Sequence, residues 1–255
     1  MNQLLQYNNW TIEQHSWAPE CEAEIQQQLT FSNGYICQTA HFEEYYSGAQ
    51  RLCTFIDGIE HPILNISSIS IRLHDERLDL ATWQVHDFYR CLHKNQPALE
   101  RHFTVTSPKG ATLQVKTKRS LLPIKEAMLI EYEITSLNYA GPISFLAMLG
   151  SSDDKVDWYP LMNHIGQDYC WLWLQMHELR LQLCCAMSWK VLYNNVPLVQ
   201  RPIKIEKQHT IGHSLITTIK PGDTCLLQKR VVIMDSRTHD KDQLINNATE
   251  CLINL

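Results

Sequence analysis

The sequence has few of the residues from which common catalytic and binding motifs are built. Only nine of its 255 residues are glycine, and neither a P-loop nor a GxGxxG motif occurs. A phosphate-binding loop made of backbone amides needs several closely spaced glycines, and the sequence offers few. A GxSxG nucleophile elbow and an HExxH zinc motif are missing as well. These gaps argue against the nucleotide-binding, hydrolase and metalloprotease sites that are easiest to read from sequence.

An excess of positive charge and a long apolar run are also missing. The 22 lysines and arginines are outnumbered by 27 aspartates and glutamates, which gives a net charge of -5 without charged runs. This balance is not the basic footprint of a nucleic-acid binder. The start MNQLLQYNNW has no basic region followed by an apolar one, and no window approaches the roughly 18 apolar residues of a membrane span. We expect a cytoplasmic protein with neither nucleic acid nor membrane as partner.

Cysteine and histidine are plentiful but lack the spacing of a metal site. The nine cysteines are an odd number without a CxxC pair, and most have apolar neighbours, which favours reduced, buried thiols. The twelve histidines form no HxH pair and are scattered in and beside expected strands. We therefore expect ordinary polar or packing histidines, no metal and no cofactor.

Alternation of apolar and polar residues predicts strands along most of the chain. Turn signals such as Asp57-Gly58 and Pro108-Lys109-Gly110 separate them, and the stretch 29–44 is expected to hold two strands around Asn33-Gly34. The further expected strands are 50–59, 66–73, 85–92, 99–107, 111–119, 127–136, 143–150, 169–176, 179–187, 203–209, 211–219 and 225–234. More than ten strands without a 20–50 residue repeat predict a large antiparallel β-sandwich of two facing sheets.

Three segments depart from this pattern. Glu20 to Leu29 is expected to be a short helix or an extended arm, and Ser151 to Gln167 a long surface loop. Asp240 to Leu255 is predicted to be a helix with a single apolar stripe. That stripe comprises Leu244, Ile245, Ala248, Cys251, Leu252 and Leu255. Because no partner follows it in the chain, we expect the helix to pack on something absent.

Two carboxylate pairs and one tryptophan pair are candidates for chemistry. Adjacent residues on a strand point to opposite faces, so Glu43-Glu44 and Asp153-Asp154 are not expected to flank one substrate atom together. Trp171 and Trp173 lie two residues apart, which places both rings on one side of a strand. They could form a sugar-stacking platform, but the leucines that alternate with them favour a core position.

Short motifs also recur in the order and spacing of a known family. They are Trp10 with Ile12 and Glu13; Asn33-Gly34-Tyr35 followed by Phe42-Glu43-Glu44; Thr54 to Ile59; Leu73 to Leu80; Tyr89 to Arg101; Arg119-Ser120; Glu131 to Asn138; and Pro221-Gly222 with Lys229 and Ser236-Arg237. The chain thereby resembles the N-terminal domain of glycoside hydrolase family 65, the group of maltose, trehalose and kojibiose phosphorylases.

The resemblance implies a galactose-mutarotase-like super β-sandwich over residues 1–239. Residues 240–255 would begin a helical linker to an (α/α)6 catalytic barrel that this chain lacks. In such a phosphorylase, a barrel glutamic acid protonates the glycosidic oxygen of an α-linked disaccharide while phosphate attacks the opposite face, in the place that water has in an inverting hydrolase. The resemblance implies a chain without catalytic residues, one that supports the barrel and contributes to a homodimer.

Two other functions stay open at this point. One is a free-standing carbohydrate-binding module, for which an exposed shelf of Trp171 and Trp173 would be required. The other is a mutarotase-like sugar enzyme, which needs a histidine and a glutamate converging in a concave cleft. The weak binding candidates are Asn33, Glu43, Trp171 and Trp173. Glu43 is the residue we would expect to contact the missing barrel.

Overall fold

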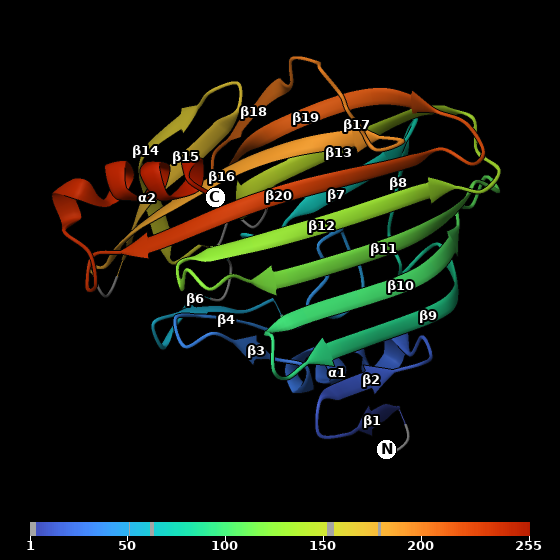
Figure 1. The fold of residues 1–255 in the computed structure, drawn as a ribbon, viewed down its shortest axis with the longest axis horizontal. Helices are drawn as coiled ribbons and strands as arrows, with labels where there is room; N and C mark the ends of the chain where they lie inside the picture. Colours follow the sequence, from blue (N-terminus) through green and yellow to red (C-terminus); the bar gives the residue numbers. More distant parts are fainter. Residues whose placement is uncertain (1–3, 51, 62–63, 152–155, 178–179) are drawn as a thin grey trace.

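The computed structural model describes residues 4–50, 52–61, 64–151, 156–177 and 180–255. Its largest sheet has eleven antiparallel strands in the order β1-β2-β9-β10-β11-β12-β20-β16-β15-β14, with β17 paired to β16 (Figure 1). These strands are β1 (Leu5–Tyr7), β2 (Thr11–Gln14), β9 (Gln84–His93), β10 (Ala98–Thr106), β11 (Thr112–Leu121), β12 (Ala127–Ser136), β14 (Trp158–Ile165), β15 (Tyr169–Met176), β16 (Gln182–Tyr193), β17 (Val196–Pro197) and β20 (Thr224–Asp235).

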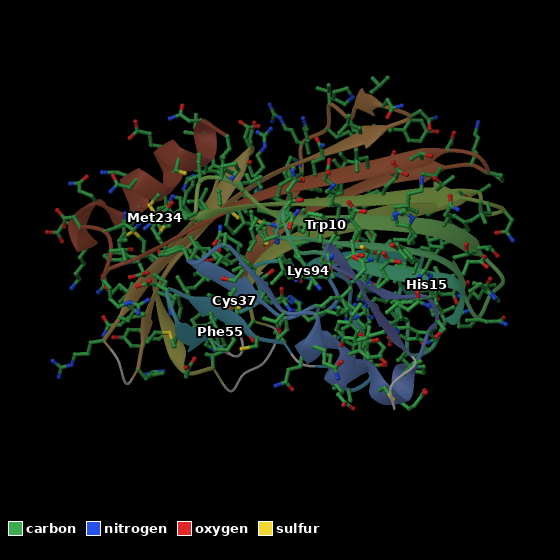
Figure 2. The ribbon with its side chains drawn as sticks, turned by 60° about the horizontal axis from the view of Figure 1, so that its bottom comes forward. Trp10, His15, Cys37, Phe55, Lys94 and Met234 are labelled. Atoms are coloured by element: carbon green, nitrogen blue, oxygen red, sulfur yellow. The ribbon has the colours of Figure 1, made fainter. Side chains whose placement is uncertain are left out.

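Two smaller antiparallel sheets form the second layer. One has the order β18-β19-β13-β7-β8 and the other β3-β4-β5-β6. Their strands are β3 (Phe31–Ser32), β4 (Ile36–Gln38), β5 (Thr54–Ile56), β6 (Ile59–His61), β7 (Ile69–Leu73), β8 (Glu76–Arg77), β13 (Gly141–Gly150), β18 (Ile203–Lys207) and β19 (Thr210–Ile219). In Figure 2, Cys37 and Phe55 mark the neighbouring strands β4 and β5 of the four-stranded sheet.

The predicted β-sandwich is confirmed, with a second layer that is split into two sheets. The five-stranded sheet covers β14, β15 and β16, while the four-stranded sheet and helix α1 (Glu22–Gln28) lie over β9 to β11. Alternate residues of the long strands fill the space between the layers, as in β12, where every second side chain is buried. One continuous apolar core results, built from all three sheets.

The expected strands lie where the alternation is clean. Strands β12 and β15 begin and end at the predicted residues, and the turns at Asp57-Gly58 and Lys109-Gly110 connect neighbouring antiparallel strands. Glu20 to Leu29, for which a helix and an extended arm were both possible, is helical: it holds the end of the 3₁₀ turn η1 (Pro19–Cys21) and all of α1.

Strand β14 contradicts the surface loop expected for Ser151 to Gln167. Its side chains are largely exposed, so the periodicity of a half-buried strand is missing. Pro160 is tolerated because β14 is an edge strand and the register with β15 shifts between Pro160 and Met162. Residues 152–155 lie outside the described residues.

Helix α2 (Leu244–Ile253) packs on the outer face of the large sheet, over β15, β16 and β20 (Figure 1). The Asp240 side chain accepts the Asp242 amide at 3.0 Å and caps the short η2 turn (Lys241–Gln243) that precedes the helix. The buried residues of the helix and the sheet residues that they meet are Leu244, Ala248 and Leu252, with Ala127, Cys184, Ala186, Val232 and Met234.

The expectation that this helix lacks a partner in the chain is therefore wrong. Strand β16 is buried on both faces from Gln182 to Met187, because the five-stranded sheet lies on one side and α2 on the other. Apolar runs of this kind are typical of strands that are covered twice.

Replacing Leu252 by asparagine should destabilise the fold by about 2–4 kcal/mol, because the substitution removes a buried side chain and inserts an unpaired amide. The neighbouring Ile253 is 67% exposed and provides a matched control. We expect Ile253→Asn to change the free energy of unfolding by less than about 0.5 kcal/mol. Urea unfolding followed by tryptophan fluorescence measures both, and equal effects would contradict the packing of α2.

Candidate functional site

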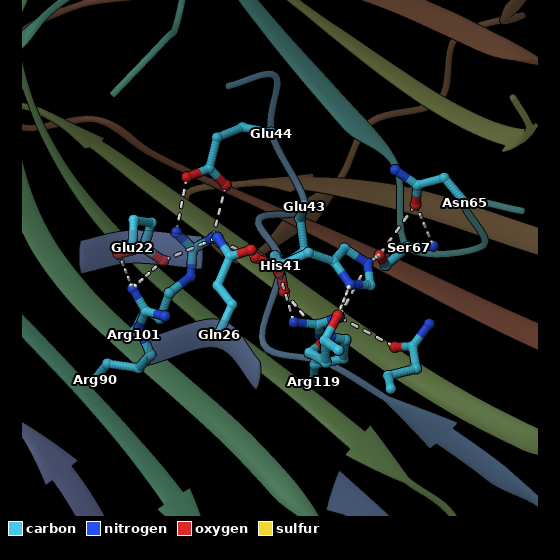
Figure 3. A network of polar contacts seen from close by, with 12 residues as sticks. Glu22, Gln26, His41, Glu43, Glu44, Asn65, Ser67, Arg90, Arg101 and Arg119 are labelled. Carbon is cyan, nitrogen blue, oxygen red and sulfur yellow. Dashed lines mark hydrogen bonds and ion pairs between the residues drawn. The ribbon is translucent and has the colours of Figure 1, made fainter. Parts of the chain in front are cut away.

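Four cations lie fully buried on the inner face of the large sheet. They are Arg90, Arg101, Arg119 and Lys229, on β9, β10, β11 and β20. Three carboxylates from the N-terminal part of the chain meet the arginines: Glu22 from α1, and Glu43 and Glu44 from the irregular segment after β4. We call the arginines, these carboxylates and His41 the buried ionic network, which Figure 3 shows from close by.

Arg101 occupies the centre of the buried ionic network. Its two terminal nitrogens donate to the two carboxylate oxygens of Glu44, at 2.8 and 2.6 Å, and the Nη2 group also donates to Glu43. Burial opposes the charged form, but the charges of Glu44 and Glu43 more than compensate and raise the pKa of Arg101 above its ordinary value. A bidentate arginine–carboxylate pair of this kind is strong and directional.

Arg119 joins Glu43 to the histidine of the network. Its Nε lies 3.0 Å from Glu43 Oε1, and its Nη2 donates to the backbone oxygen of His41 at 2.7 Å. Burial lowers the pKa of the Arg119 guanidinium to about 10, although the Glu43 charge opposes this. For Glu43, burial raises the pKa, yet Arg101 and Arg119 outweigh it and leave the pKa below its ordinary value.

The imidazole of His41 is neutral at physiological pH. Burial and then the charges of Arg119 and Arg101 hold its pKa well below 6.5. Its Nε2 lies 2.7 Å from Ser67 Oγ, and its Nδ1 lies 3.2 Å from Thr39 Oγ1. The ring thus bridges the network to the loop before β7.

Glu22 and Arg90 form a further ion pair of the network. Arg90 Nη2 donates to both carboxylate oxygens at 2.7 and 2.9 Å, and Gln26 Nε2 donates to Glu22 Oε1 at 2.9 Å. Burial raises the pKa of Glu22 despite the nearby Arg90. This pair fixes helix α1 on the inner face of β9.

Lys229 differs from the three arginines, because oxygen atoms of the backbone replace the carboxylate. Its Nζ donates to the carbonyl of Met148 at 2.6 Å and to that of Ser68 at 3.1 Å. Burial lowers the pKa of Lys229 to about 7. The side chain therefore connects β20 of the large sheet to the five-stranded sheet without a full counter-charge.

The strand geometry assumed for Glu43 and Glu44 is wrong, while the prediction that they do not flank one substrate atom stays untested. Because neither residue belongs to a strand, pleat geometry does not apply, and both side chains reach the same guanidinium. Three arginines and three glutamates balance, so the network can hold the layers together but offers no free acid or base. For Asp153-Asp154 the structure gives no answer, since both lie outside the described residues.

A histidine and a glutamate do converge here, as a mutarotase-like site would require. His41 and Glu43 both contact Arg119, but His41 is 0% and Glu43 2% exposed. Although Glu43 borders a surface groove, its carboxylate is engaged by Arg101 and Arg119, so neither side chain is free to act on a sugar ring. The arrangement is that of a structural network, not of an accessible acid–base pair.

The other candidates lie apart from the network. The side-chain oxygen of Asn33 accepts the amides of Tyr35 and Ile36 at 3.1 and 2.9 Å, which shapes the β3–β4 turn. Trp171 and Trp173 are half-buried and pack against the cluster beneath α2. Among the described residues, Asn33, Trp171 and Trp173 make no recorded hydrogen bond or ring contact with Glu43.

Sequence reasoning missed the buried arginines, although a signal for them exists. Arg119 has the same strand phase as Val115, Thr117 and Leu121, all of which face the core. A charged residue in the apolar phase of a strand predicts a buried cation, and a buried cation requires a partner. That partner could not be identified from alternation alone.

Neither a membrane-spanning helix nor a metal site occurs in the described ranges. Within them, no helix is long and apolar enough to cross a membrane. No group of three or more histidine, cysteine, aspartate or glutamate side chains in the same part of the chain could hold a metal ion. All nine cysteines are free thiols, and six of them are buried.

Comparisons with known proteins agree with this architecture. Residues 12–254 match the model of the glycosyl hydrolase family 65, N-terminal domain. An α,α-trehalose phosphorylase from Thermoanaerobacter brockii is 23% identical over 176 residues, which cover 59% of this chain and 23% of the relative. A solved protein from the human microbiome, assigned as a kojibiose phosphorylase, has a TM-score of 0.87 at 17% identity and is matched over 98% of this chain and 36% of its own. The chain thus spans well under half the length of either relative.

Proposed function

Because the chain belongs to the N-terminal domain family of glycosyl hydrolase family 65, we propose that it is the non-catalytic part of an α-glucoside phosphorylase or hydrolase. Residues 1–239 are its β-sandwich domain, and residues 240–255 begin the linker to an (α/α)6 catalytic barrel. The barrel acts on an α-linked disaccharide, with phosphate as the attacking group if the enzyme is a phosphorylase, and the sandwich supports the barrel. The match over residues 12–254 carries this proposal.

The buried ionic network on the inner face of the large sheet favours a structural, non-catalytic role for this domain. Phosphorolysis by inversion needs a carboxylic acid that can reach the glycosidic oxygen. The carboxylates of Glu22, Glu43 and Glu44 are buried and engaged by arginines, so none is poised to donate a proton to a sugar. The network instead holds the N-terminal segment rigidly against β9 to β11.

The purified chain should release no glucose phosphate from trehalose, kojibiose or maltose in the presence of inorganic phosphate. A complete trehalose phosphorylase serves as the positive control for the assay. Turnover by the isolated chain would overturn the non-catalytic assignment. Polarimetry of freshly dissolved α-glucose in the same samples tests the mutarotase alternative, and light scattering measures whether the chain forms the proposed homodimer.

A further inference from the structure

A groove of about 420 Å³ lies between the segment after β4 and the outer side of the five-stranded sheet. Its walls come from the stretch 42–46, from β7 and β8, from β13, and from the turn that joins β18 to β19. We call it the basic groove, because Arg72, Arg77 and Lys207 line it. Figure 1 shows β7 and β13 as neighbours in the second layer, behind the large sheet.

Two arginines face each other across strands in this groove. Arg72 on β7 is the register partner of Arg77 on β8, so their side chains project from the same face. Like charges directly opposite each other destabilise an antiparallel pair. Within the described ranges, neither guanidinium forms an ion pair within 4.0 Å. The fold thus holds two cations together without neutralising them.

The guanidinium of Arg77 is held in place by its neighbours. It lies over the ring of Tyr45, with 3.8 Å between the guanidinium carbon and the ring centroid, and its Nε donates to Ser70 Oγ at 3.3 Å. No described residue accepts from its terminal nitrogens. Stacking fixes the plane of an arginine and leaves its fork of donors available for a planar or tetrahedral oxyanion.

Carboxylates near the groove are already engaged. Glu43 and Glu44 border it, but their oxygens are bound by Arg101 and Arg119 beneath its floor. Asp79, whose charge acts on Arg77, accepts the backbone amides of Ser47 and Ala81. The groove therefore keeps an excess of positive charge, to which Lys207 on the opposite wall adds.

We propose that the basic groove binds a phosphate group, with Arg72 and Arg77 as its bidentate donors. The groove walls also carry the exposed polar side chains of Gln50 and Gln208. The ligand is thus inorganic phosphate or a hexose phosphate, bound independently of any catalytic domain. The site adjoins the buried ionic network at Glu43 and Glu44, but the arginines of the network are engaged by carboxylates and offer no free donor to the groove.

Isothermal titration of the purified chain tests this proposal with inorganic phosphate, glucose 1-phosphate and glucose as separate ligands. We expect a dissociation constant on the order of 1 mM or tighter for at least one phosphate ligand, weakened at least about tenfold by Arg77→Gln and by Arg72→Gln. Lys116→Gln, on the outer face of β11, should leave it unchanged. Tighter binding of glucose 1-phosphate identifies a hexose phosphate as ligand, and equal binding identifies phosphate alone.

Three results would overturn the proposal: no heat up to about 20 mM of either phosphate ligand, glucose binding as tightly as glucose 1-phosphate, or unchanged affinity in both arginine variants. Thermal unfolding of each variant checks the fold. If Arg77→Gln fails to fold because stacking on Tyr45 is lost, Arg72→Gln still decides the question, since Arg72 is exposed.

Discussion

Replacing Arg101 by methionine should destabilise the protein by about 3–5 kcal/mol, which is a large part of the stability of a typical domain. Both carboxylate oxygens of Glu44 and one of Glu43 accept hydrogen bonds from this guanidinium. Both side chains are at most 1% exposed, so water cannot replace the lost donors. Urea unfolding at neutral pH measures the loss as a lower midpoint with an unchanged slope.

A surface pair on the neighbouring strand provides the control for this prediction. Lys118 and Glu100 lie 2.8 Å apart, but both are partly exposed. Lys118→Met should therefore cost less than about 1 kcal/mol. Adding Glu43→Gln and Glu44→Gln to Arg101→Met should restore part of the stability, because the uncompensated charges are then removed. An Arg101→Met variant within about 1 kcal/mol of the wild type would show that the network does not stabilise the fold.

The arginines of this network could have been predicted as buried residues. Along β10, Leu99, Arg101, Phe103 and Val105 share one phase, and every one of them is buried. Alternation alone therefore places the Arg101 side chain in the core, where an isolated charge is too costly to persist. The sequence thus predicts that a buried counter-ion accompanies Arg101.

Which residues supply that counter-ion could not be predicted from the same pattern. Glu43 and Glu44 belong to an irregular segment 57 or more residues before Arg101, and their conformation depends on packing against β9 to β11. A strand geometry assumed for them gave the wrong result, because adjacent side chains diverge only on a pleated strand. Long-range pairing of this kind requires the folded chain.

For helix α2, too, the sequence pattern predicts which residues are buried but not which residues they contact. Its apolar stripe was read correctly, as Leu244 and Leu252 are buried. Its partner residues include Cys184 and Ala186 on β16, and nothing in the apolar stripe of the helix identifies them. A strand that is covered on both faces shows no alternation of apolar and polar residues. Its second covering layer can be inferred only from an uninterrupted apolar run.

The stability of the wild type should rise with pH between about 7 and 10, relative to that of Lys229→Met. Burial lowers the pKa of Lys229 to about 7 in the folded chain, whereas the ordinary value is 10.5. Between these two values the unfolded chain binds more protons than the folded one, so raising the pH favours folding. The gain is at most about 1.4 kcal/mol per pH unit and about 4 kcal/mol from pH 7 to pH 10. Below pH 7 both states are protonated, and the difference between the two proteins should level off.

Unfolding curves of both proteins at several pH values measure this difference, in which the other titrating groups cancel. The exposed Lys190 on β16 is the matched control, because Lys190→Met removes a lysine of the same chemistry without burial. We expect the curve of Lys190→Met to follow that of the wild type at every pH. Parallel curves for Lys229→Met and the wild type would mean that Lys229 stays charged in the fold. In that case, its two carbonyl acceptors, Met148 and Ser68, would be sufficient to solvate the ammonium.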